Sequence, residues 1–286
     1  MKVLITGANG QLGNEMRIVA KQHTEVDFVF TDVEELNICN ADEVDSFVKN
    51  LRPDYIVNCA AYTAVDKAEI DIELCQAINC DAVRNLGIAA EQYQDKIIHV
   101  STDYVFDGTS NIPYTETMPT NPQTIYGKTK LEGEKALLSV CNASFIIRTS
   151  WLYSSFGNNF VKTMLRLGNE RDSLNVVFDQ VGTPTYAADL ANVIWKIIIS
   201  GETDFGVYHF SNEGVCSWYD FATAIFELSG VDCKVSPIES SEYPTKTPRP
   251  FYSVLNKRKI KSSFAISIPH WEVSLQKCLQ ILKEDN

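Results

Sequence analysis

The chain has 286 residues, of which 45% are hydrophobic and 22% charged, and its formal net charge is −12 at pH 7. This composition is that of a globular protein with an ample core, and the negative charge argues against nucleic acid or an anionic membrane as a partner. The eight cysteines are scattered without a Cys-x-x-Cys pair, and we find neither a signal-peptide pattern nor an apolar run long enough to span a bilayer. We therefore expect reduced thiols, no zinc site and a cytoplasmic location.

The first element is a short apolar run, Lys2–Thr6, which predicts a β-strand. Three glycines follow it, Gly7, Gly10 and Gly13, and a helical pattern begins directly after them. Glycine accepts the positive φ of a tight turn and lets the backbone approach a pyrophosphate, while the helix N-terminus offers free N–H donors. This order of strand, glycine turn and helix predicts a dinucleotide site.

A second apolar run covers residues 26–32 and ends at Asp32. It lies close to the spacing of about 20 residues at which an acidic side chain binds the adenosine ribose of a dinucleotide. A helix or turn cap is the alternative for Asp32, and the two are compatible. A carboxylate here would repel a 2′-phosphate and so favour NADH over NADPH.

Strands and helices then alternate. Helical patterns cover residues 40–51 and 67–94, the second with Asn79 inside it, and strand patterns cover 53–61, 97–102 and 143–151. Repeated strand–helix units predict an α/β fold, a doubly wound parallel sheet of the Rossmann type. Ligands bind such sheets beyond the carboxyl ends of the strands. We expect the residues that follow four strand ends to converge there, namely Gly7, Asp32, Ala61 and Thr102.

Three polar side chains suggest the chemistry of this edge. Thr102 ends a predicted strand, and Tyr126 and Lys130 open a predicted helix one turn apart, on one face. An ammonium group beside a phenol lowers the phenol pKa from about 10 towards neutrality, where acid–base catalysis is most effective. Thr102 would polarise a substrate carbonyl by a hydrogen bond. Together they predict the reduction of a carbonyl, although a tyrosine and lysine at this spacing also occur on ordinary helix surfaces.

The alternation changes after Trp151. We expect residues 1–150 to form the dinucleotide-binding domain, rejoined by about 181–212, and residues 151–180 and 213–286 to form a smaller C-terminal α/β substrate domain. The proline-rich stretch 243–253 is too apolar for a linker. Within it, Arg249 is the candidate for contact with an anionic substrate, with an ordinary surface arginine as the alternative.

Seven stretches together resemble the extended short-chain dehydrogenase/reductases and, within them, the dTDP-4-dehydrorhamnose reductase family: GANGQLG, VNCAAYTAVDKAE, STDYVFDG, YGKTKLEGE, RTSWLY, DQVGTPT and RPFYSVL. The resemblance covers nearly the whole chain. It implies an NADH- or NADPH-dependent reduction of the C4 keto group of dTDP-6-deoxy-L-lyxo-4-hexulose, which gives dTDP-L-rhamnose. It also implies that Thr102, Tyr126 and Lys130 are the catalytic trio, and that Tyr126 and Lys130 also bind the cofactor, with Lys130 at the nicotinamide ribose.

The same resemblance implies binding residues. Asn37 departs from the family pattern, which often has aspartate at that position. A core tryptophan is the alternative interpretation of Trp151. The positions carried over are, for the pyrophosphate turn, Gly10, Gln11 and Leu12; for the adenine side, Asn37 and Ile38; for the nicotinamide side, Ala61, Tyr62 and Thr63; and for the sugar, Thr102, Asp103 and Trp151.

Other functions of this superfamily are weighed against the reductase. Nucleotide-sugar 4,6-dehydratases carry Thr-Asp-Glu at the strand end, whereas this chain has Tyr104 in place of the glutamate. An epimerase and a non-catalytic regulatory subunit on the same fold stay open as alternatives. Some members dimerise through carboxylate-bound Mg²⁺, and Glu15 stands at a matching place. A monomer or homodimer, the choice of NADH or NADPH, and a bound Mg²⁺ are left open.

Overall fold

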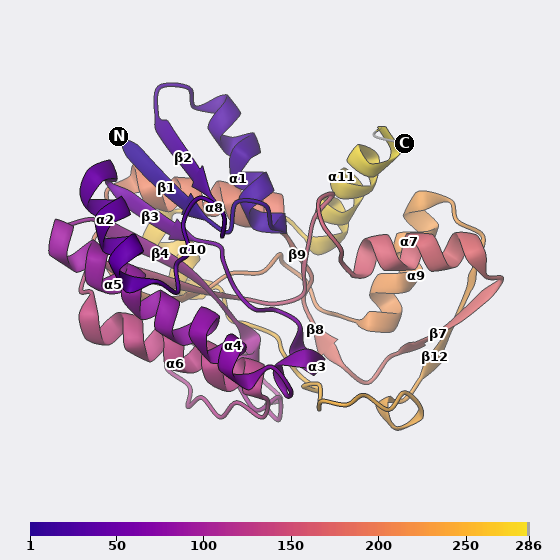
Figure 1. Cartoon of the computed structure of the whole chain (residues 1–286). Helices are drawn as coiled ribbons and strands as arrows, with labels where there is room; N and C mark the ends of the chain where they lie inside the picture. Colours follow the sequence, from indigo (N-terminus) through magenta and orange to yellow (C-terminus); the bar gives the residue numbers. More distant parts are fainter. Residues whose placement is uncertain (285–286) are drawn as a thin grey trace.

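A parallel sheet of six strands forms the larger part of the molecule (Figure 1), and this computed structural model describes residues 1–284. The strands lie in the order β2 (Asp27–Thr31), β1 (Lys2–Thr6), β3 (Tyr55–Asn58), β4 (Lys96–Thr102), β5 (Ser144–Thr149) and β10 (Gly206–His209). The chain passes from β1 to β2 on one side of it and then to β3 on the other side, so the topology switches between β1 and β3. A doubly wound parallel sheet, as predicted, is therefore present.

The central strands are apolar runs because both of their faces are covered by helices. Every residue of β3 and β5 is buried, and in β4 all but Lys96 and Val100 are. The parallel register pairs Ile98 of β4 with Val57 of β3 and with Phe145 of β5. This register carries Asn58, Thr102 and Thr149 to the same carboxyl edge of the sheet.

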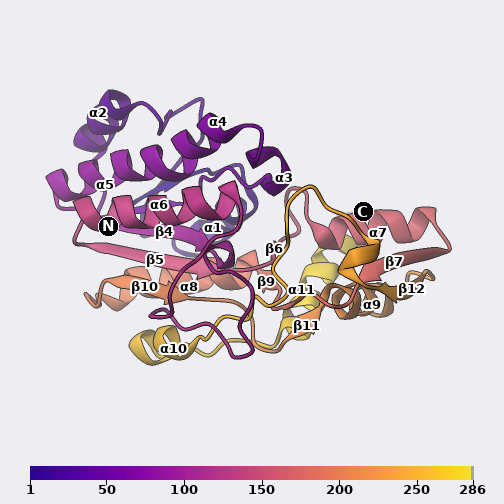
Figure 2. The same cartoon turned by 90° about the horizontal axis from the view of Figure 1, so that it is seen from below.

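Helices cover both faces of the sheet (Figure 2). On one side lie α1 (Gln11–Gln22), α8 (Ala187–Ser200) and α10 (Arg258–Phe264), and on the other lie α2 (Ala41–Leu51), α5 (Ala82–Tyr93) and α6 (Ile125–Val140). Two of them start at polar caps, because Asn40 accepts from the N–H of Glu43 and Thr124 from the N–H of Gly127.

The helical pattern over residues 67–94 is divided in the structure, whereas the sequence predicts one long region. The elements are α3 (Val65–Ala68), α4 (Ile72–Gln76), a π-helical turn (Ala77–Asp81) and α5. The π turn contains Asn79, and it packs so closely on α6 that a Cβ at Gly133 would lie 2.0 Å from the Asn79 carbonyl oxygen. Such turns are frequent at functional sites.

The smaller part of the molecule has its own apolar core. Its helices are α7 (Phe160–Glu170), α9 (Trp218–Ser229) and α11 (Trp271–Glu284), and its longest strand pair is β7 (Ser173–Val177) with β12 (Lys234–Ile238). Short pairs join β6 (Leu152–Tyr153) to β9 (Thr185–Tyr186) and β8 (Val181–Gly182) to β11 (Cys216–Ser217). Two 3₁₀ turns cover Asp103–Val105 and Ser240–Glu242.

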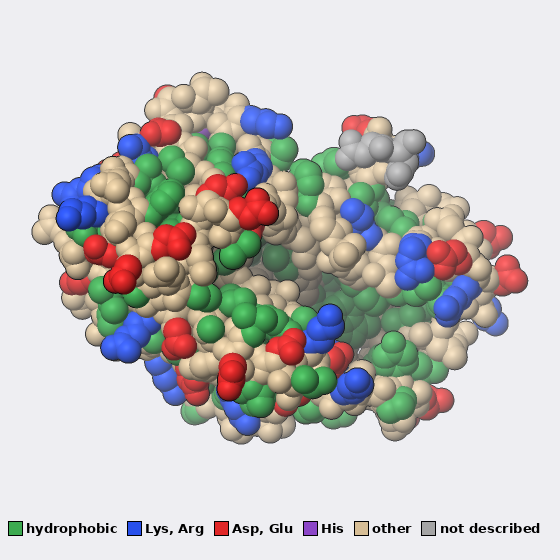
Figure 3. Space-filling view, viewed as in Figure 1, with side chains coloured by type: hydrophobic (Ala, Val, Ile, Leu, Met, Phe, Trp, Pro, Cys, Tyr) green, Lys and Arg blue, Asp and Glu red, His purple; other side chains and the backbone are tan. Residues whose placement is uncertain are grey.

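A hollow separates the two parts, and apolar side chains are visible in it (Figure 3). The chain crosses between the parts more than once, since α8 packs on α1 and β10 hydrogen-bonds to β5. Residues 190–198 and 260–268 contribute to the core of the larger part, while Trp151 and Phe160 pack against the core of the smaller one. Within residues 1–284, no helix has the length and apolar character that crossing a membrane requires.

Candidate functional site

The glycine turn after β1 is shaped by close backbone contacts. Gly7 has φ of +65°, and a Cβ on it would lie 2.6 Å from the backbone of Ala60 at the end of β3. A Cβ on Gly13 would lie 2.4 Å from the carbonyl oxygen of Gly7. No side chain caps the N-terminus of α1, which starts at Gln11, so its first N–H groups are available for a ligand. This cradle fits the pyrophosphate of a dinucleotide.

Gly13→Ala is expected to weaken dinucleotide binding strongly and to lower the free energy of unfolding by about 1–3 kcal/mol, because the added methyl group overlaps backbone that cannot move aside. Calorimetric titration with NADPH and denaturant unfolding measure the two effects. Gly10→Ala is the milder comparison for stability, since its Cβ would lie 3.3 Å from the Gly7 carbonyl oxygen, against 2.4 Å for Gly13→Ala. Unchanged stability and binding in the Gly13 variant would contradict the packing described here.

Asp32 lies beside the glycine turn, as the sequence predicts. One carboxylate oxygen accepts from the N–H of Asn9 at 3.0 Å, and the other accepts from the N–H of Val33. On the predicted adenine side, Asn37 is exposed and its side chain accepts from the N–H of Cys39, while Ile38 is buried. Asp32 thus shapes the turn and is also placed to bind a ribose hydroxyl.

The predicted nicotinamide side is the segment after β3. Its residues Ala61 and Tyr62 are half-buried and Thr63 is exposed. Asn79 accepts from the N–H of Tyr62 at 2.9 Å and donates to its carbonyl oxygen at 3.1 Å, so one side chain fixes the backbone of this segment. The phenol of Tyr62 donates to Asp71 at 2.7 Å. The side chain of Asn79 therefore serves to hold this backbone.

Tyr126 and Thr102 are brought together at the end of β4. The hydroxyl of Thr102 interacts with the phenol of Tyr126, and the ring of Tyr104 packs edge-on against the Tyr126 ring with 5.5 Å between centroids. Burial raises the pKa of Tyr126 above 10, and the neighbouring Asp103 and Tyr104 raise it further. The predicted lowering of this pKa by Lys130 is wrong for this structure, because the loss of solvation dominates.

Lys130 is almost completely buried, with 1% of its surface exposed. Its Nζ donates to the carbonyl oxygen of Val100 at 2.7 Å and lies 3.3 Å from Nε2 of His99. Burial lowers the pKa of Lys130 to about 8, although the carboxylate of Glu134 opposes this shift. The amine is therefore a group that changes charge near neutral pH.

Asp103 follows Thr102 and is buried. It accepts from the Thr102 hydroxyl at 2.9 Å and interacts with the Ser253 hydroxyl, while its second oxygen has no partner. Burial raises the pKa of this carboxyl to about 7. A carboxyl at this position, with an unpartnered oxygen, is placed to contact a bound sugar.

The Asp103 pKa predicts a pH dependence of stability. The folded chain holds this proton up to about pH 7, whereas the unfolded chain loses it near pH 4, so the free energy of unfolding falls as pH rises across that window. Asp103→Asn should remove the part of this fall that Asp103 contributes and stabilise the chain by about 2–4 kcal/mol above pH 7, with little change below pH 4. Denaturant unfolding at several pH values measures it.

Asp95 provides the matched control for that prediction. It is buried too, and burial also raises its pKa to about 7. Asp95→Asn should flatten the pH dependence of stability in the same way, but it should leave the pH dependence of activity unchanged. If Asp103→Asn lost stability at every pH, the buried carboxyl would instead be an essential hydrogen-bonding group.

Trp151 stands at the junction of the two parts. Its backbone has a positive φ of 49°, which is strained for a tryptophan, and its ring stacks on Trp218 at 3.6 Å between centroids. A Cβ on Gly182 would lie 2.7 Å from this ring, so only glycine fits beneath it. The half-buried ring is a rigid apolar surface, which fits the predicted sugar contact as well as a core tryptophan.

Arg249 comes to the site from the proline-rich stretch. It forms an ion pair with Asp66 at 2.7 Å and interacts with the phenol of Tyr104, the neighbour of Tyr126. Stretch 243–253 packs closely against Gly108, since a Cβ added to this glycine would lie 2.5 Å from Pro250. A cavity of about 40 Å³ lies between Arg249 and Tyr104. The proposed anion contact of Arg249 would therefore compete with Asp66 for the guanidinium.

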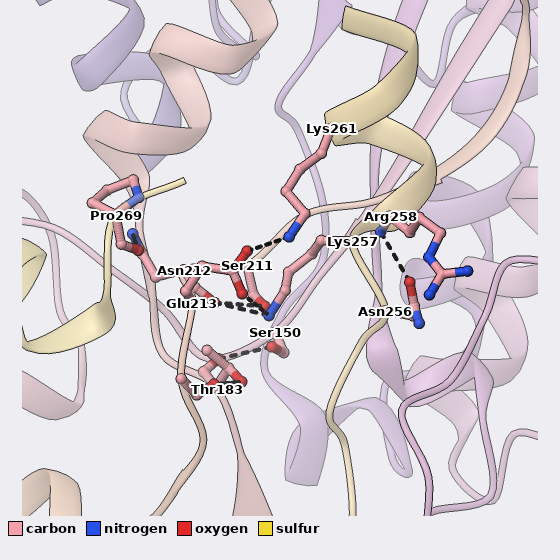
Figure 4. Close-up of polar contacts among 11 residues, drawn as sticks. Ser150, Thr183, Ser211, Asn212, Glu213, Asn256, Lys257, Arg258, Lys261 and Pro269 are labelled. Atoms are coloured by element: carbon pink, nitrogen blue, oxygen red, sulfur yellow. Dashed lines mark hydrogen bonds and ion pairs between the residues drawn. The ribbon is translucent and has the colours of Figure 1, made fainter. Parts of the chain in front are cut away.

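A larger cavity, of about 340 Å³, is lined by none of the predicted site residues. Figure 4 shows its polar groups, in which Lys257 and Lys261 both pair with Glu213 and Lys257 also donates to the carbonyl oxygen of Asn212. One carboxylate thus serves two ammonium groups, and the guanidinium of Arg258 also lines this cavity.

Glu15 does not stand in a cluster of metal ligands. It accepts a hydrogen bond from Ser154 at 2.6 Å, and burial raises its pKa. Within the described residues 1–284, no group of three or more histidine, cysteine, aspartate or glutamate side chains could hold a metal ion.

Gln11, assigned to the pyrophosphate turn, accepts from Asn159 of the smaller part at 2.9 Å, while Leu12 is buried in the core.

Sequence reasoning missed a set of buried polar residues behind the trio. Asn58 and His99 contact one another and His99 reaches Lys130, while Glu134 and Arg148 form a buried ion pair. Polar residues within strands of otherwise apolar residues, such as His99 in β4, are the signal that could have found them. Such residues are rarely buried without a specific partner.

The fold and this edge of the sheet define a Rossmann-type protein of the extended short-chain dehydrogenase/reductase class. The model of the RmlD substrate binding domain family matches residues 1–284. The dTDP-4-dehydrorhamnose reductase of Aggregatibacter actinomycetemcomitans is 44% identical, over 96% of this chain and 97% of that protein. The chain therefore belongs to the RmlD substrate binding domain family.

Two solved structures are similar over nearly their whole length. A dTDP-4-dehydrorhamnose reductase from Clostridium acetobutylicum is 45% identical with a TM-score of 0.95, covering 99% of this chain and 100% of the other. The enzyme of the same name from Bacillus anthracis, solved in complex with NADP, is 40% identical with a TM-score of 0.94, covering 98% of this chain and 99% of the other. These likenesses establish the fold class predicted from the sequence and the family it resembles.

Proposed function

We propose that this chain reduces the C4 keto group of dTDP-6-deoxy-L-lyxo-4-hexulose to give dTDP-L-rhamnose, with NADPH or NADH as the reductant. The observation that carries the proposal is the meeting of Thr102 and Tyr126 at the carboxyl edge of the sheet, with Lys130 one turn on, in a member of this family. The names of the relatives support the substrate, and the B. anthracis structure with NADP supports the cofactor.

The residues of the chain fit a dinucleotide. The turn at Gly7, Gly10 and Gly13 would hold the pyrophosphate, Asp32 the adenosine ribose, and the segment beginning at Ala61 the nicotinamide side. When bound, the reduced nicotinamide supplies the hydride that the reaction requires. The backbone of Tyr62, clamped by Asn79, keeps that end of the site in one shape.

The proton comes from the chain itself. The raised pKa of Tyr126 keeps its phenol protonated at working pH, so the phenol is ready to act as the acid. As hydride adds to C4, the carbonyl oxygen becomes an alkoxide, a stronger base than phenolate, and takes the proton of Tyr126. The Thr102 hydroxyl, which donates to Asp103 in this structure, would stabilise charge on the same oxygen by turning its proton towards it.

We assign a different binding role to each of the two parts of the molecule. We propose residues 1–150, rejoined by about 181–212, as the dinucleotide-binding domain, and residues 151–180 and 213–286 as the sugar-nucleotide domain. The separate apolar cores support this division with two exceptions: α10 packs with the first core, and β8 and β9, at the start of 181–212, pair with strands of the smaller part. We further propose a cytoplasmic location, because the structure keeps the eight cysteines unpaired.

A reduction assay tests the proposal. The protein is mixed with the 4-keto sugar nucleotide and NADPH or NADH, the loss of reduced-nicotinamide absorbance is followed, and the product is identified by mass spectrometry. Stoichiometric oxidation of the cofactor with a product two hydrogens heavier is expected. An isomeric product without net cofactor oxidation would indicate the epimerase, and no product with any keto sugar would indicate the non-catalytic subunit.

A further inference from the structure

A chain of buried polar groups runs from the first strand of the sheet to the amine of Lys130. Thr6 Oγ1 donates to Asn58 Oδ1 at 2.8 Å, Asn58 Nδ2 lies 3.1 Å from His99 Nδ1, and His99 Nε2 lies 3.3 Å from Lys130 Nζ. Asn58 and His99 are fully buried, and Thr6 and Lys130 are each 1% exposed. Buried polar groups are hydrogen-bonded, so the donors and acceptors of this chain have to match one another.

The orientation of the Asn58 amide is determined by its neighbours. The backbone N–H of Ala60 can only donate, and it points at Asn58 Oδ1 over 3.1 Å. The opposite orientation would place two donors face to face. Asn58 therefore presents its NH₂ group to His99, and Nδ1 of His99 has to accept. A neutral imidazole whose Nδ1 accepts carries its proton on Nε2.

That proton faces Lys130. An ammonium group has three donors and no acceptor, so it cannot accept a hydrogen bond from Nε2–H. The free amine has a lone pair for this bond, and one of its hydrogens goes to the carbonyl oxygen of Val100 at 2.7 Å. Burial lowers the pKa of His99 well below its usual value, so the ring stays neutral.

We propose that Asn58 and His99 are positioning residues that set the protonation state of Lys130, because they aim a fixed N–H donor at its nitrogen and so favour the free amine. Only the assignment of Lys130 to catalysis rests on the proposed function; the donor order stands on the chain itself. Other groups near this amine also affect whether it is protonated. Glu134, one turn along α6, favours the ammonium form, as does Cys75 of α4, while burial opposes it.

The first experiment reads the tautomer of His99 directly. The chain has four histidines, so NMR of protein labelled with ¹⁵N in the histidine rings can be assigned by single substitutions, with His99→Gln for this ring. The expected result is a neutral Nε2–H ring at every pH at which the folded protein is stable. A cationic ring, or the Nδ1–H tautomer, would overturn the proposal. This measurement needs neither cofactor nor substrate, so it is independent of the reduction assay.

His209 is an internal control in the same spectrum. It is also fully buried, but its Nδ1 lies 3.1 Å from the carbonyl oxygen of Tyr114, an acceptor. Burial lowers the pKa of His209 to about 3, so it too is neutral. It is expected to show the opposite, Nδ1–H tautomer, and the spectrum therefore contains both neutral forms for comparison.

The second experiment reverses the donor order. Asn58→Asp keeps the shape of the side chain, and an ionised carboxylate would accept from Nδ1–H of His99 and leave the Nε2 lone pair towards Lys130. The amine of Lys130 should then bind its proton about tenfold more tightly or more, a shift of at least about one pH unit. Lysine ¹³Cε shifts, assigned with Lys130→Met, measure this change, and the pH profile of kcat should move in the same direction.

Thr6→Val is the matched control for that variant. It removes one hydrogen bond of Asn58, but the Ala60 N–H still fixes the amide, so both the tautomer and the proton affinity of Lys130 should stay as in the parent. A reversed tautomer in Asn58→Asp without tighter proton binding at Lys130 would overturn the proposal. If Asn58→Asp does not fold, the parent spectrum still decides the question through the tautomer of His99.

Discussion

Replacing Tyr126 with phenylalanine is expected to lower kcat by about 10²- to 10⁴-fold while dinucleotide binding stays nearly unchanged. The phenol is the acid beside Thr102 at the end of β4, and burial raises its pKa, so it holds the transferable proton at working pH. The ring itself packs on Tyr104, and phenylalanine preserves this contact. Steady-state kinetics with the keto sugar nucleotide and calorimetric titration with NADPH measure the two quantities separately.

Tyr104→Phe is the control for that substitution. Tyr104 is the adjacent, half-buried tyrosine, and its hydroxyl interacts with Arg249, away from the proposed site of proton transfer. The same loss of one hydroxyl should therefore cost far less turnover. Equal losses in both variants would show that the phenylalanine effect is general damage to the site, and full activity of Tyr126→Phe would remove the assigned role.

Much of the fold could be predicted because buried parallel strands leave a plain pattern in the sequence. The run Lys2–Thr6 is β1 with the same bounds, and the glycine turn and helix follow as expected. The division of residues 67–94 could not be predicted from periodicity, and neither could the contact of Asn79 with the backbone of Tyr62, which lies outside the helical pattern. Sequence spacing along one helix does not reveal partners of this kind.

The candidate site, like the fold, could be predicted only in part. Thr102 and Tyr126 could be placed together because one ends a strand and the other opens the helix that packs beside it. The direction of the Tyr126 pKa could not be predicted, because it depends on how thoroughly neighbouring residues exclude water from the phenol. The partners of Lys130 could not be predicted either, since His99 comes to it from β4 and the helical pattern around Glu134 does not mark it as a buried carboxylate.

Replacing Glu134 with glutamine is expected to lower the free energy of unfolding by about 3–5 kcal/mol. Its carboxylate accepts bidentate bonds from Arg148, with 2.6 Å between Oε2 and Nη2, and the two side chains are only 2% and 5% exposed. The substitution leaves a buried guanidinium without its counter-charge. Denaturant unfolding at neutral pH measures the loss, and it should exceed that of any exposed ion pair in the described part of the chain.

Arg166 and Glu170 offer the matched comparison, because they form an Arg–Glu pair at 3.0 Å on an exposed helix face. Glu170→Gln should cost no more than about 0.5 kcal/mol, since water already solvates both charges. Replacing both buried partners together, Glu134→Leu with Arg148→Met, should restore much of the stability that the single change loses, because no unpaired charge is then left inside. A single Glu134→Gln variant as stable as the parent would mean that water reaches Arg148, and burial would then no longer explain the lowered pKa of Lys130 beside it.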